Sequence, residues 1–337
     1  MKSNWDFLLS EFRRLGGIAD NICQKEGDFG RGIFPVDSSL RSRIFTPSRL
    51  MIKKEDVYLE DNKIRIRQDK EYDQELRKFF NFYQDNFSWS YSGKETTENF
   101  EKGLSLFNGE LKQLIKNNTL FDLEQRHQRN WDEVVKEQFL KSRVVSFGKY
   151  QFIASIWELV NHKVKSLPFI ISEKGISTPN YPSINCELRH SYGNTGPLNR
   201  FFSYGFFSPE TIVFSFPFTM TDNNKSFHIS CKGKCLNDDS MKIERSNNQI
   251  TLEGLPIADS NNCKLVRDYF EEIRKRIGEI NLSKDFLLRI FELNIEKRNS
   301  IISQSTLVDN KISKMLTKTI QYEISLILSE SSNCKNL

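Results

Sequence analysis

Short apolar runs broken by turn residues occupy two separate stretches of the chain, and helical patterns fill most of the rest. Residues 17–52 and 147–217 carry such runs, interrupted by Gly, Pro, Asp and Ser. This pattern is typical of short β-strands joined by turns. Residues 57–143 instead carry apolar side chains at helical spacing, and the chain becomes helical again from residue 263. The sequence therefore predicts an α+β fold.

Amphipathic stripes locate the individual helices. Glu98–Ile115 carries one continuous stripe, which predicts a single helix, and Trp131–Leu140 predicts another. Three further stripes after residue 263 predict three helices, which can pack as a bundle with its own core. The final residues, Ser329–Leu337, are polar, and we expect them to be frayed.

The composition is that of a mildly basic globular protein. The chain has 337 residues, enough for two domains, and a formal net charge of +5 with acidic and basic residues well mixed. This excess is too small to indicate nucleic-acid binding. The sequence has no run of about 18 apolar residues, and its N-terminus lacks the pattern of a signal peptide. We therefore expect no membrane association and a cytoplasmic location.

The six cysteines do not form a recognisable metal-binding pattern. Only Cys231 and Cys235 are closely spaced, and no second Cys or His pair follows them at the spacing of a zinc finger. We expect reduced thiols and no metal site.

Two short motifs contain residue types suited to binding a polar ligand. In Phe29-Gly30-Arg31-Gly32, two glycines flank one side chain, so the backbone can bend tightly and approach a ligand closely. Asn161-His162 ends an apolar run that contains Glu158. The Asn amide has two donors and an acceptor, and can therefore recognise the polar end of a zwitterion. Taken alone, each motif also fits a plain turn or strand end.

Three other motifs are equally ambiguous when taken alone. Ser142-Arg143 follows a predicted helix, where an Arg commonly interacts with the helix dipole. Tyr192-Gly193 lies in a turn-rich segment, and Tyr204-Gly205-Phe206 lies in a block crowded with Phe, where a Tyr usually packs in the core. Motifs of nucleotide-binding loops, zinc proteases, serine hydrolases and dinucleotide-binding folds are absent from the sequence.

The order and spacing of these motifs resemble the SET-domain protein lysine methyltransferases, and within them the Rubisco large-subunit methyltransferase type. The resemblance implies an irregular β-rich SET catalytic domain over residues 1–217, with a helical insert at about 58–142. It implies a connecting segment of strands and loops over residues 218–262. An α-helical substrate-binding domain over residues 263–330 would follow.

The resemblance also implies a role for each motif. The cofactor, S-adenosylmethionine, would contact a set of residues in the glycine turn, the Ser-Arg junction, the Asn-His pair and the Tyr-Gly-Phe block: Phe29, Gly30, Arg31, Gly32, Arg143, Asn161, His162 and Tyr204. Tyr204 would also be the catalytic residue. The residues implied on the substrate side are Ser142, Glu158, Tyr192 and Phe214.

The implied function is transfer of a methyl group to the side-chain amine of a lysine in a protein substrate. The implied enzyme works as a monomer without metal, nucleic acid or membrane. One alternative is methylation of another protein side chain, such as histidine. A second alternative is a catalytically inactive SET-like module that binds a protein partner.

Overall fold

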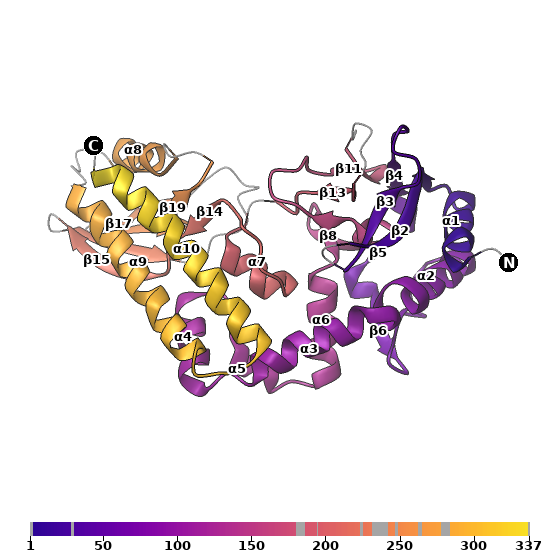
Figure 1. Cartoon of the computed structure of the whole chain (residues 1–337), viewed down its shortest axis with the longest axis horizontal. Helices are drawn as coiled ribbons and strands as arrows, with labels where there is room; N and C mark the ends of the chain where they lie inside the picture. The colour runs from indigo at the N-terminus through magenta and orange to yellow at the C-terminus, as the bar shows by residue number, and fades with distance from the viewer. Residues whose placement is uncertain are drawn as a thin grey trace. The chain divides into compact units, whose positions relative to one another are not determined.

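The computed structural model describes residues 3–27, 30–179, 186–193, 195–222, 225–230, 242–246, 249–261, 265–277 and 284–335 (Figure 1). These residues fall into two compact units. Unit 1 contains Met1–Asn99 and Asn130–Tyr192, and unit 2 contains Phe100–Arg129 and Gly193–Leu337. The domain boundaries implied at residues 217 and 263 describe functional modules rather than compact units, and they remain a prediction.

Unit 1 is built from short strands in several small sheets. One antiparallel sheet has the order β1 (Ile18–Asp20), β4 (Arg43–Pro47), β12 (Gly175–Ser177) and β11 (Ile170–Ser172). A second has the order β5 (Met51–Lys53), β9 (Tyr150–Ala154) and β8 (Val144–Phe147). The two-stranded pairs are β2 (Ile22–Gly27) with β3 (Gly30–Pro35), β6 (Val57–Glu60) with β7 (Lys63–Ile66), and β10 (Asn161–His162) with β13 (Arg189–His190). Only the last of these pairs is parallel.

Helices cover the strands of unit 1 and share a single core with them. These are α1 (Asn4–Arg14), α2 (Gln74–Phe87), the π-helical turn Trp89–Gly93 and α6 (Trp131–Lys141). Ser3 and Asp6 form a capping box that starts α1, and the Asp73 side chain caps α2. The apolar stripe of α1 buries Phe12 against Phe79 of α2, with ring centroids 6.0 Å apart. The amphipathic pattern of each helix thus determines the face that packs on the strands.

Unit 2 combines a mixed sheet with helices. The sheet has the order β15 (Phe218–Asp222), β16 (Lys225–Ser230), β18 (Gln249–Glu253) and β17 (Lys242–Ser246), and β14 (Ile212–Phe214) pairs separately with β19 (Pro256–Asp259). Its helices include α4 (Gly109–Asn118), α5 (Leu123–His127), α7 (Pro197–Tyr204), α8 (Leu265–Ile277), α9 (Lys284–Ser305) and α10 (Lys311–Lys335), and α3 (Lys94–Ser105) ends in it. Residues 218–262, expected to be a connecting segment, therefore contribute a sheet.

The three C-terminal helices do not have a core of their own, contrary to the sequence prediction. Helices α9 and α10 lie side by side (Figure 1). One end of this pair packs with α8 on strand residues such as Phe227 and Leu252. Their other portion packs on α3, α4 and α7 through Ile301 and Leu316. Amphipathic stripes cannot distinguish helices that face one another from helices that face a sheet, because both require the same spacing.

Two helix boundaries also differ from the predictions. The stripe of Glu98–Ile115 belongs to two helices, because Asn108 interrupts it and its Oδ1 accepts a hydrogen bond of 2.7 Å from the Leu111 main-chain N–H. This is an N-cap, which starts α4. The C-terminal tail is helical rather than frayed up to Lys335, because Glu330 and Cys334 are buried against the rest of unit 2.

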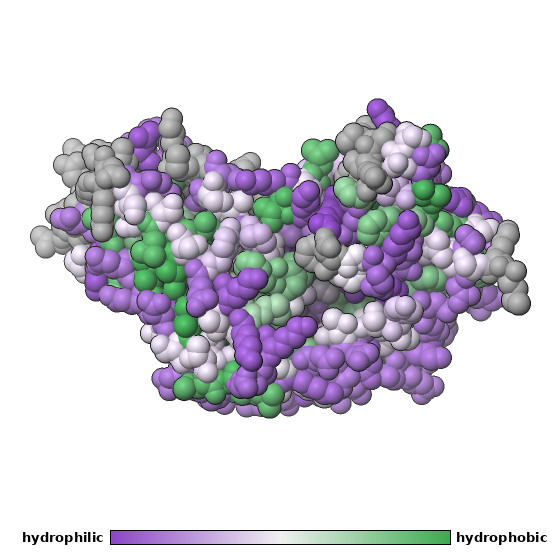
Figure 2. Space-filling model, in the orientation of Figure 1, coloured by the Kyte–Doolittle hydropathy of each residue, from purple (hydrophilic) through white to green (hydrophobic). Residues whose placement is uncertain are grey.

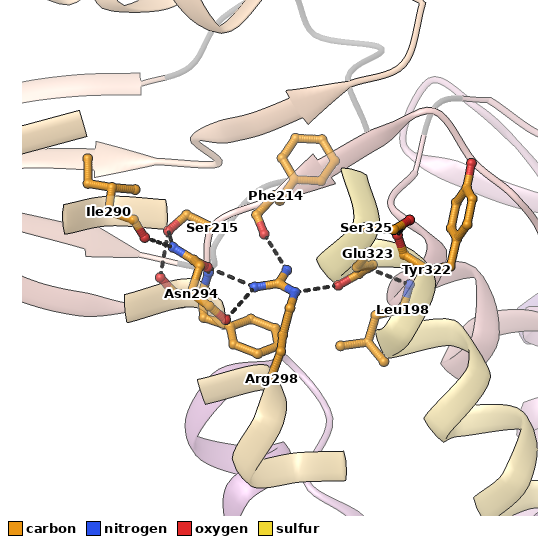
Figure 3. A network of polar contacts seen from close by, with 10 residues as sticks. Leu198, Phe214, Ser215, Ile290, Asn294, Arg298, Tyr322, Glu323 and Ser325 are labelled. Atoms are coloured by element: carbon orange, nitrogen blue, oxygen red, sulfur yellow. Dashed lines mark hydrogen bonds and ion pairs between the residues drawn. The ribbon is translucent and has the colours of Figure 1, made fainter. Parts of the chain in front are cut away.

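A fully buried arginine connects four elements of unit 2 (Figure 3). Arg298 of α9 forms an ion pair of 2.8 Å with Glu323 of α10. It also donates to Oδ1 of Asn294 at 2.8 Å and to the main-chain oxygen of Phe214 on β14 at 2.9 Å. Oε1 of Glu323 accepts from the Leu198 main-chain N–H at the start of α7, at 2.9 Å. A buried charge is tolerated only with such complete pairing.

Hydrophilic residues predominate on the face shown in Figure 2, and apolar residues form small patches there. Exposed large apolar side chains such as Leu106, Leu120 and Leu307 lie in the loops that follow α3, α4 and α9, and single exposed apolar side chains are ordinary on a protein surface. None of the helices in the described part of the chain is both long and apolar enough to cross a membrane.

Candidate functional site

The glycine turn lies in the β2–β3 hairpin of unit 1, where Gly27 pairs with Gly30. Gly30 has a φ of +81°, a conformation that favours glycine, and a Cβ added there would meet no neighbour. Residue 32 must be glycine for a steric rather than a conformational reason, because a Cβ at that position would collide with the carboxylate of Glu187. Phe29, implied as a cofactor contact, lies outside the described residues.

The Arg31 side chain extends from this turn to the π-helical turn of the insert. Its guanidinium carbon lies 3.8 Å from the centroid of the Tyr91 ring, and Nη2 donates to Oγ of Ser92 at 3.2 Å. Nη1 is buried and has no hydrogen-bond partner among the described residues. Burial lowers the pKa of this guanidinium, and the nearby Arg143 acts in the same direction. Arg31 therefore carries a charge that is only partly compensated.

Glu158 is the buried carboxylate nearest to these two arginines. Its side chain is fully shielded from solvent, and Oε1 accepts hydrogen bonds from Tyr83, at 3.0 Å, and from Ser88. Nη1 of Arg143 lies 3.9 Å from the same oxygen. Burial raises the pKa of the Glu158 carboxyl, and Arg143 opposes that shift. The second oxygen, Oε2, is buried and accepts no hydrogen bond from a described residue.

Arg143 follows α6 directly and is held over it. Its guanidinium carbon lies 4.6 Å from the centroid of the Phe139 ring. Ser142, the C-cap of α6, donates its hydroxyl hydrogen to the main-chain oxygen of Phe139 at 2.8 Å. Nε of Arg143 is buried and donates to no described residue. In this structure Ser142 therefore stabilises the end of the helix, whereas Arg143 retains an unused donor.

Several buried polar atoms of unit 1 lack a hydrogen-bond partner among the described residues. Those on charged side chains are Nη1 of Arg31, Nε of Arg143 and Oε2 of Glu158, and the others belong to the neutral side chains of Trp5, Gln24, Gln84 and Ser155. Leaving a buried polar group unsatisfied costs free energy, about 1–3 kcal/mol each, so such groups usually have a purpose. Two arginines face a single buried carboxylate, which leaves positive charge in excess. The arrangement therefore suits a ligand with an anionic group for the guanidinium donors and a donor for the carboxylate.

Asn161 and His162 form β10, beside β13. Nδ2 of Asn161 donates to the main-chain oxygen of Arg31, at 3.1 Å, and to Oε1 of Glu187, at 2.5 Å. This links the Asn-His pair directly to the glycine turn. Nδ1 of His162 accepts from the main-chain N–H of Tyr192 at 3.1 Å, and the two rings lie 5.0 Å apart.

Tyr192 packs into the aromatic group that surrounds His162. Its hydroxyl donates to the main-chain oxygen of Val160 at 2.9 Å, and its ring lies 4.8 Å from that of His190. These contacts are sufficient to explain Tyr192 as a residue that packs within unit 1. Its predicted contact with a substrate is not tested by them and remains a prediction.

Tyr204, the predicted catalytic residue, lies in unit 2 as the last residue of α7. Gly205 follows with a φ of +77° and ends the helix. The ring of Tyr204 lies 4.7 Å from the guanidinium carbon of Arg200, which forms a buried ion pair of 2.8 Å with Glu210. The ring is therefore supported by a fixed cation on its own helix.

Phe214, predicted on the substrate side, also lies in unit 2. Its ring borders a small cavity of about 40 Å³, together with Gly196 and Leu120. Arg298 and Glu323 line the same cavity, and both are engaged in the buried network described above. The cavity therefore offers no unsatisfied charge from these two residues to a ligand.

Several residues of the site carried no recognisable signal in the sequence. Tyr83 and Ser88 resemble ordinary residues of an amphipathic helix and its end, and Tyr91 and Ser92 resemble an exposed turn. Glu187 follows a segment that the structure does not describe and has no motif around it. The packing of the insert against the strands brings the four insert side chains to Arg31 and Glu158, and the pairing of β10 with β13 brings Glu187 to Asn161.

Comparison with known proteins supports the fold. No family model matches the sequence, and no curated protein matches it. A solved structure of Rubisco LSMT bound to AdoMet is similar to this chain with a TM-score of 0.51 and 14% identity, covering 100% of this chain and 92% of that one. The SET domain of LSMT bound to lysine and AdoHcy has a TM-score of 0.46 and 12% identity, covering 99% of this chain and 91% of that one. The likeness to the first structure confirms the predicted α+β fold of the SET type.

Proposed function

We propose that this chain is an S-adenosylmethionine-dependent protein methyltransferase that methylates the side-chain amine of a lysine. The fold is similar to that of a solved structure of Rubisco LSMT bound to AdoMet. The motifs from Gly30 to Tyr204 match the order of that family's motifs. The protein substrate itself is a further part of the proposal, as is the preference for lysine over histidine.

The observation that carries the proposal is the set of unsatisfied atoms in unit 1. Arg31 and Arg143 each retain a buried N–H donor, and Glu158 retains a buried acceptor. The methionyl end of the cofactor has a carboxylate, which guanidinium groups bind well. The residues present therefore fit the group: Arg31 and Arg143 bind its carboxylate, and Asn161 binds its ammonium.

Methyl transfer from a sulfonium to an amine does not require a covalent bond to any protein side chain. When bound, S-adenosylmethionine supplies a methyl group on a positively charged sulfur for attack by a neutral amine. Lysine has an unperturbed pKa of about 10.4, so a site that disfavours the ammonium form assists the reaction. In this proposal Oε2 of Glu158 accepts a hydrogen bond from the substrate amine. The catalytic role of Tyr204 is proposed separately, from the resemblance of its Tyr-Gly-Phe motif.

Calorimetric titration with S-adenosylhomocysteine tests the cofactor site. We expect the wild type to bind and Arg143→Met to bind at least tenfold more weakly, since a hydrogen bond to a charged group contributes about 1.5–3 kcal/mol. Arg65→Met is the matched control, because the Arg65 guanidinium in the same unit is already paired with Asp85 at 2.8 Å. A wild type that does not bind at millimolar ligand would contradict the proposal.

Transfer of label from methyl-labelled S-adenosylmethionine to the proteins of a cell lysate tests the reaction. We expect a labelled protein whose modified residue is a lysine, and loss of that label with Arg143→Met. Label on a histidine would replace the substrate assignment. Cofactor binding without any transfer would instead favour an inactive SET-like binding module.

A further inference from the structure

The hydrogen-bond partners of Asn161 determine the orientation of its side-chain amide, that is, which atom is the nitrogen and which is the oxygen. Nδ2 lies 3.1 Å from the main-chain oxygen of Arg31 and 2.5 Å from Oε1 of Glu187. A main-chain oxygen and a carboxylate oxygen are both hydrogen-bond acceptors. Turning the amide over would place Oδ1 against two acceptor oxygens, which repel it. The two hydrogens of Nδ2 are thus both used, and Oδ1 is the polar atom that remains.

The Glu187 carboxylate is itself held in place from several sides. Oε2 accepts from Nε of Arg189 at 2.8 Å and lies 2.7 Å from Nη2 of the same guanidinium. Its neighbour in the chain, Leu188, donates its main-chain N–H to the oxygen of Ile33 at 2.7 Å, which attaches the segment to β3. The Glu187 residue is only 5% exposed. The carboxylate therefore has a fixed position, which requires glycine at residue 32.

We propose that Glu187 is a positioning residue that turns the Asn161 amide so that its oxygen faces the ligand. Among the described residues none donates to Oδ1 of Asn161. An acceptor in this position selects a ligand that brings an N–H donor, and repels one that brings a carboxylate oxygen to the same place. Resting on the proposed function, this inference assigns Asn161 Oδ1 to the ammonium group of the cofactor's amino-acid end.

Glu187→Gln is the informative variant. The Gln side chain keeps the size of Glu but brings an amide that can donate to Oδ1 of Asn161. Of the two oxygens that oppose a turned Asn161 amide, only the main-chain oxygen of Arg31 then remains, so the turned amide becomes accessible. Nδ2 then faces the ligand and meets its ammonium as donor against donor. Glu173→Gln is the matched control, because Glu173 is exposed in the same unit and far along the chain from the glycine turn.

The two ligands for the test are S-adenosylhomocysteine and 5′-methylthioadenosine, which lacks the amino-acid end. For Glu187→Gln we expect the Kd of S-adenosylhomocysteine to rise at least tenfold and that of methylthioadenosine to change less than twofold. In turnover, KM for the cofactor should rise while kcat stays nearly constant. Glu173→Gln should match the wild type with both ligands.

Other outcomes would overturn the inference. Equal weakening of both ligands would show that Glu187 merely stabilises unit 1, and tighter binding of S-adenosylhomocysteine would show that the carboxylate competes with the ligand. Should Glu187→Gln fail to fold, Arg189→Met gives a second test, since it frees the Glu187 carboxylate to move away from Asn161 and should weaken S-adenosylhomocysteine more than methylthioadenosine. A wild type that binds neither ligand refutes the proposed function, whereas a Glu187→Gln protein that behaves as wild type refutes only the role of Glu187.

Discussion

Oε1 of Glu158 lies 3.0 Å from the hydroxyl oxygen of Tyr83, and neither side chain is exposed to solvent. Tyr58 and Glu60 make the same kind of hydrogen bond, 2.7 Å long, on the surface of the same unit. The two pairs differ mainly in burial. A buried hydrogen bond to a charged group contributes more, because water cannot replace the lost donor.

Tyr83→Phe is therefore expected to lower the free energy of unfolding by about 1.5–3 kcal/mol at neutral pH. Tyr58→Phe should change it by less than about 0.5 kcal/mol. Loss of the Tyr83 donor destabilises ionised Glu158, so the cost should shrink as the pH falls and the carboxyl is protonated. Urea unfolding of both variants at two pH values measures this, and equal costs for the two tyrosines would contradict it.

Gly32→Ala should destabilise unit 1, because the new Cβ would collide with Glu187 and displace the carboxylate from Asn161. Overpacking of this kind costs about 1–3 kcal/mol. Gly109→Ala is the control, since a Cβ at that position meets no neighbour and Ala favours the helix over Gly by about 1 kcal/mol. Thermal unfolding should thus move in opposite directions for the two variants. A neutral Gly32→Ala would mean that Glu187 is free to move away.

Tyr204→Phe should lower methyl transfer at least 10²-fold, equivalent to about 2.7 kcal/mol of transition-state stabilisation. Binding of S-adenosylhomocysteine and the melting temperature should change little, because the ring and its contact with Arg200 are retained. Tyr322→Phe serves as the control for removing a partly buried hydroxyl in the same unit. If Tyr204→Phe turned over normally and only melted earlier, Tyr204 would be a core residue.

Glu323→Leu should destabilise unit 2 by about 3–5 kcal/mol, because it leaves the charge of Arg298 buried and unpaired. It also removes the acceptor for the first turn of α7. The control is Glu292→Leu, in an exposed ion pair with Arg289 of 3.1 Å, for which we expect less than about 1 kcal/mol. Chemical denaturation distinguishes them, and comparable small effects would show that the network in Figure 3 adds little.

Glu330 should make the protein less stable as the pH rises. Burial, with a contribution from Asp259, raises the pKa of the Glu330 carboxyl to about 7. The unfolded chain releases this proton near pH 4.3, so between about pH 4.5 and 7 the folded state binds the extra proton and loses stability with increasing pH. Glu330→Gln removes this cost, and we expect the free energy of unfolding of the variant to exceed that of the wild type by roughly 1–2 kcal/mol at pH 8.

The same comparison at pH 4.5 should show little difference, because the wild-type carboxyl is then protonated in the folded state. Melting temperatures of the two proteins at both pH values check this. A variant that is less stable than the wild type at pH 8 would mean that Glu330 is held as a carboxylate by a favourable contact.

Local spacing was sufficient to locate most elements of this fold. The stripe of Trp131–Leu140 predicted α6, and the short runs between Gly and Pro predicted the small strands of unit 1. The α+β class followed from the separation of these patterns. What spacing could not show was the partner of each apolar face, so the C-terminal helices were expected to form their own core although they pack on β16 and β18.

For the site, the sequence by itself determined the residues whose chemistry is visible locally: the glycine turn at Gly30, Arg143 after its helix, and Asn161. Only the tertiary structure decided what they contact. Tyr83 lies 75 residues before Glu158 in the chain, and Asn161 lies 26 residues before Glu187. Hydrogen bonds between such distant residues depend on how the insert and the strands pack, and burial then makes these bonds strong and leaves Arg31, Arg143 and Glu158 with unused polar atoms.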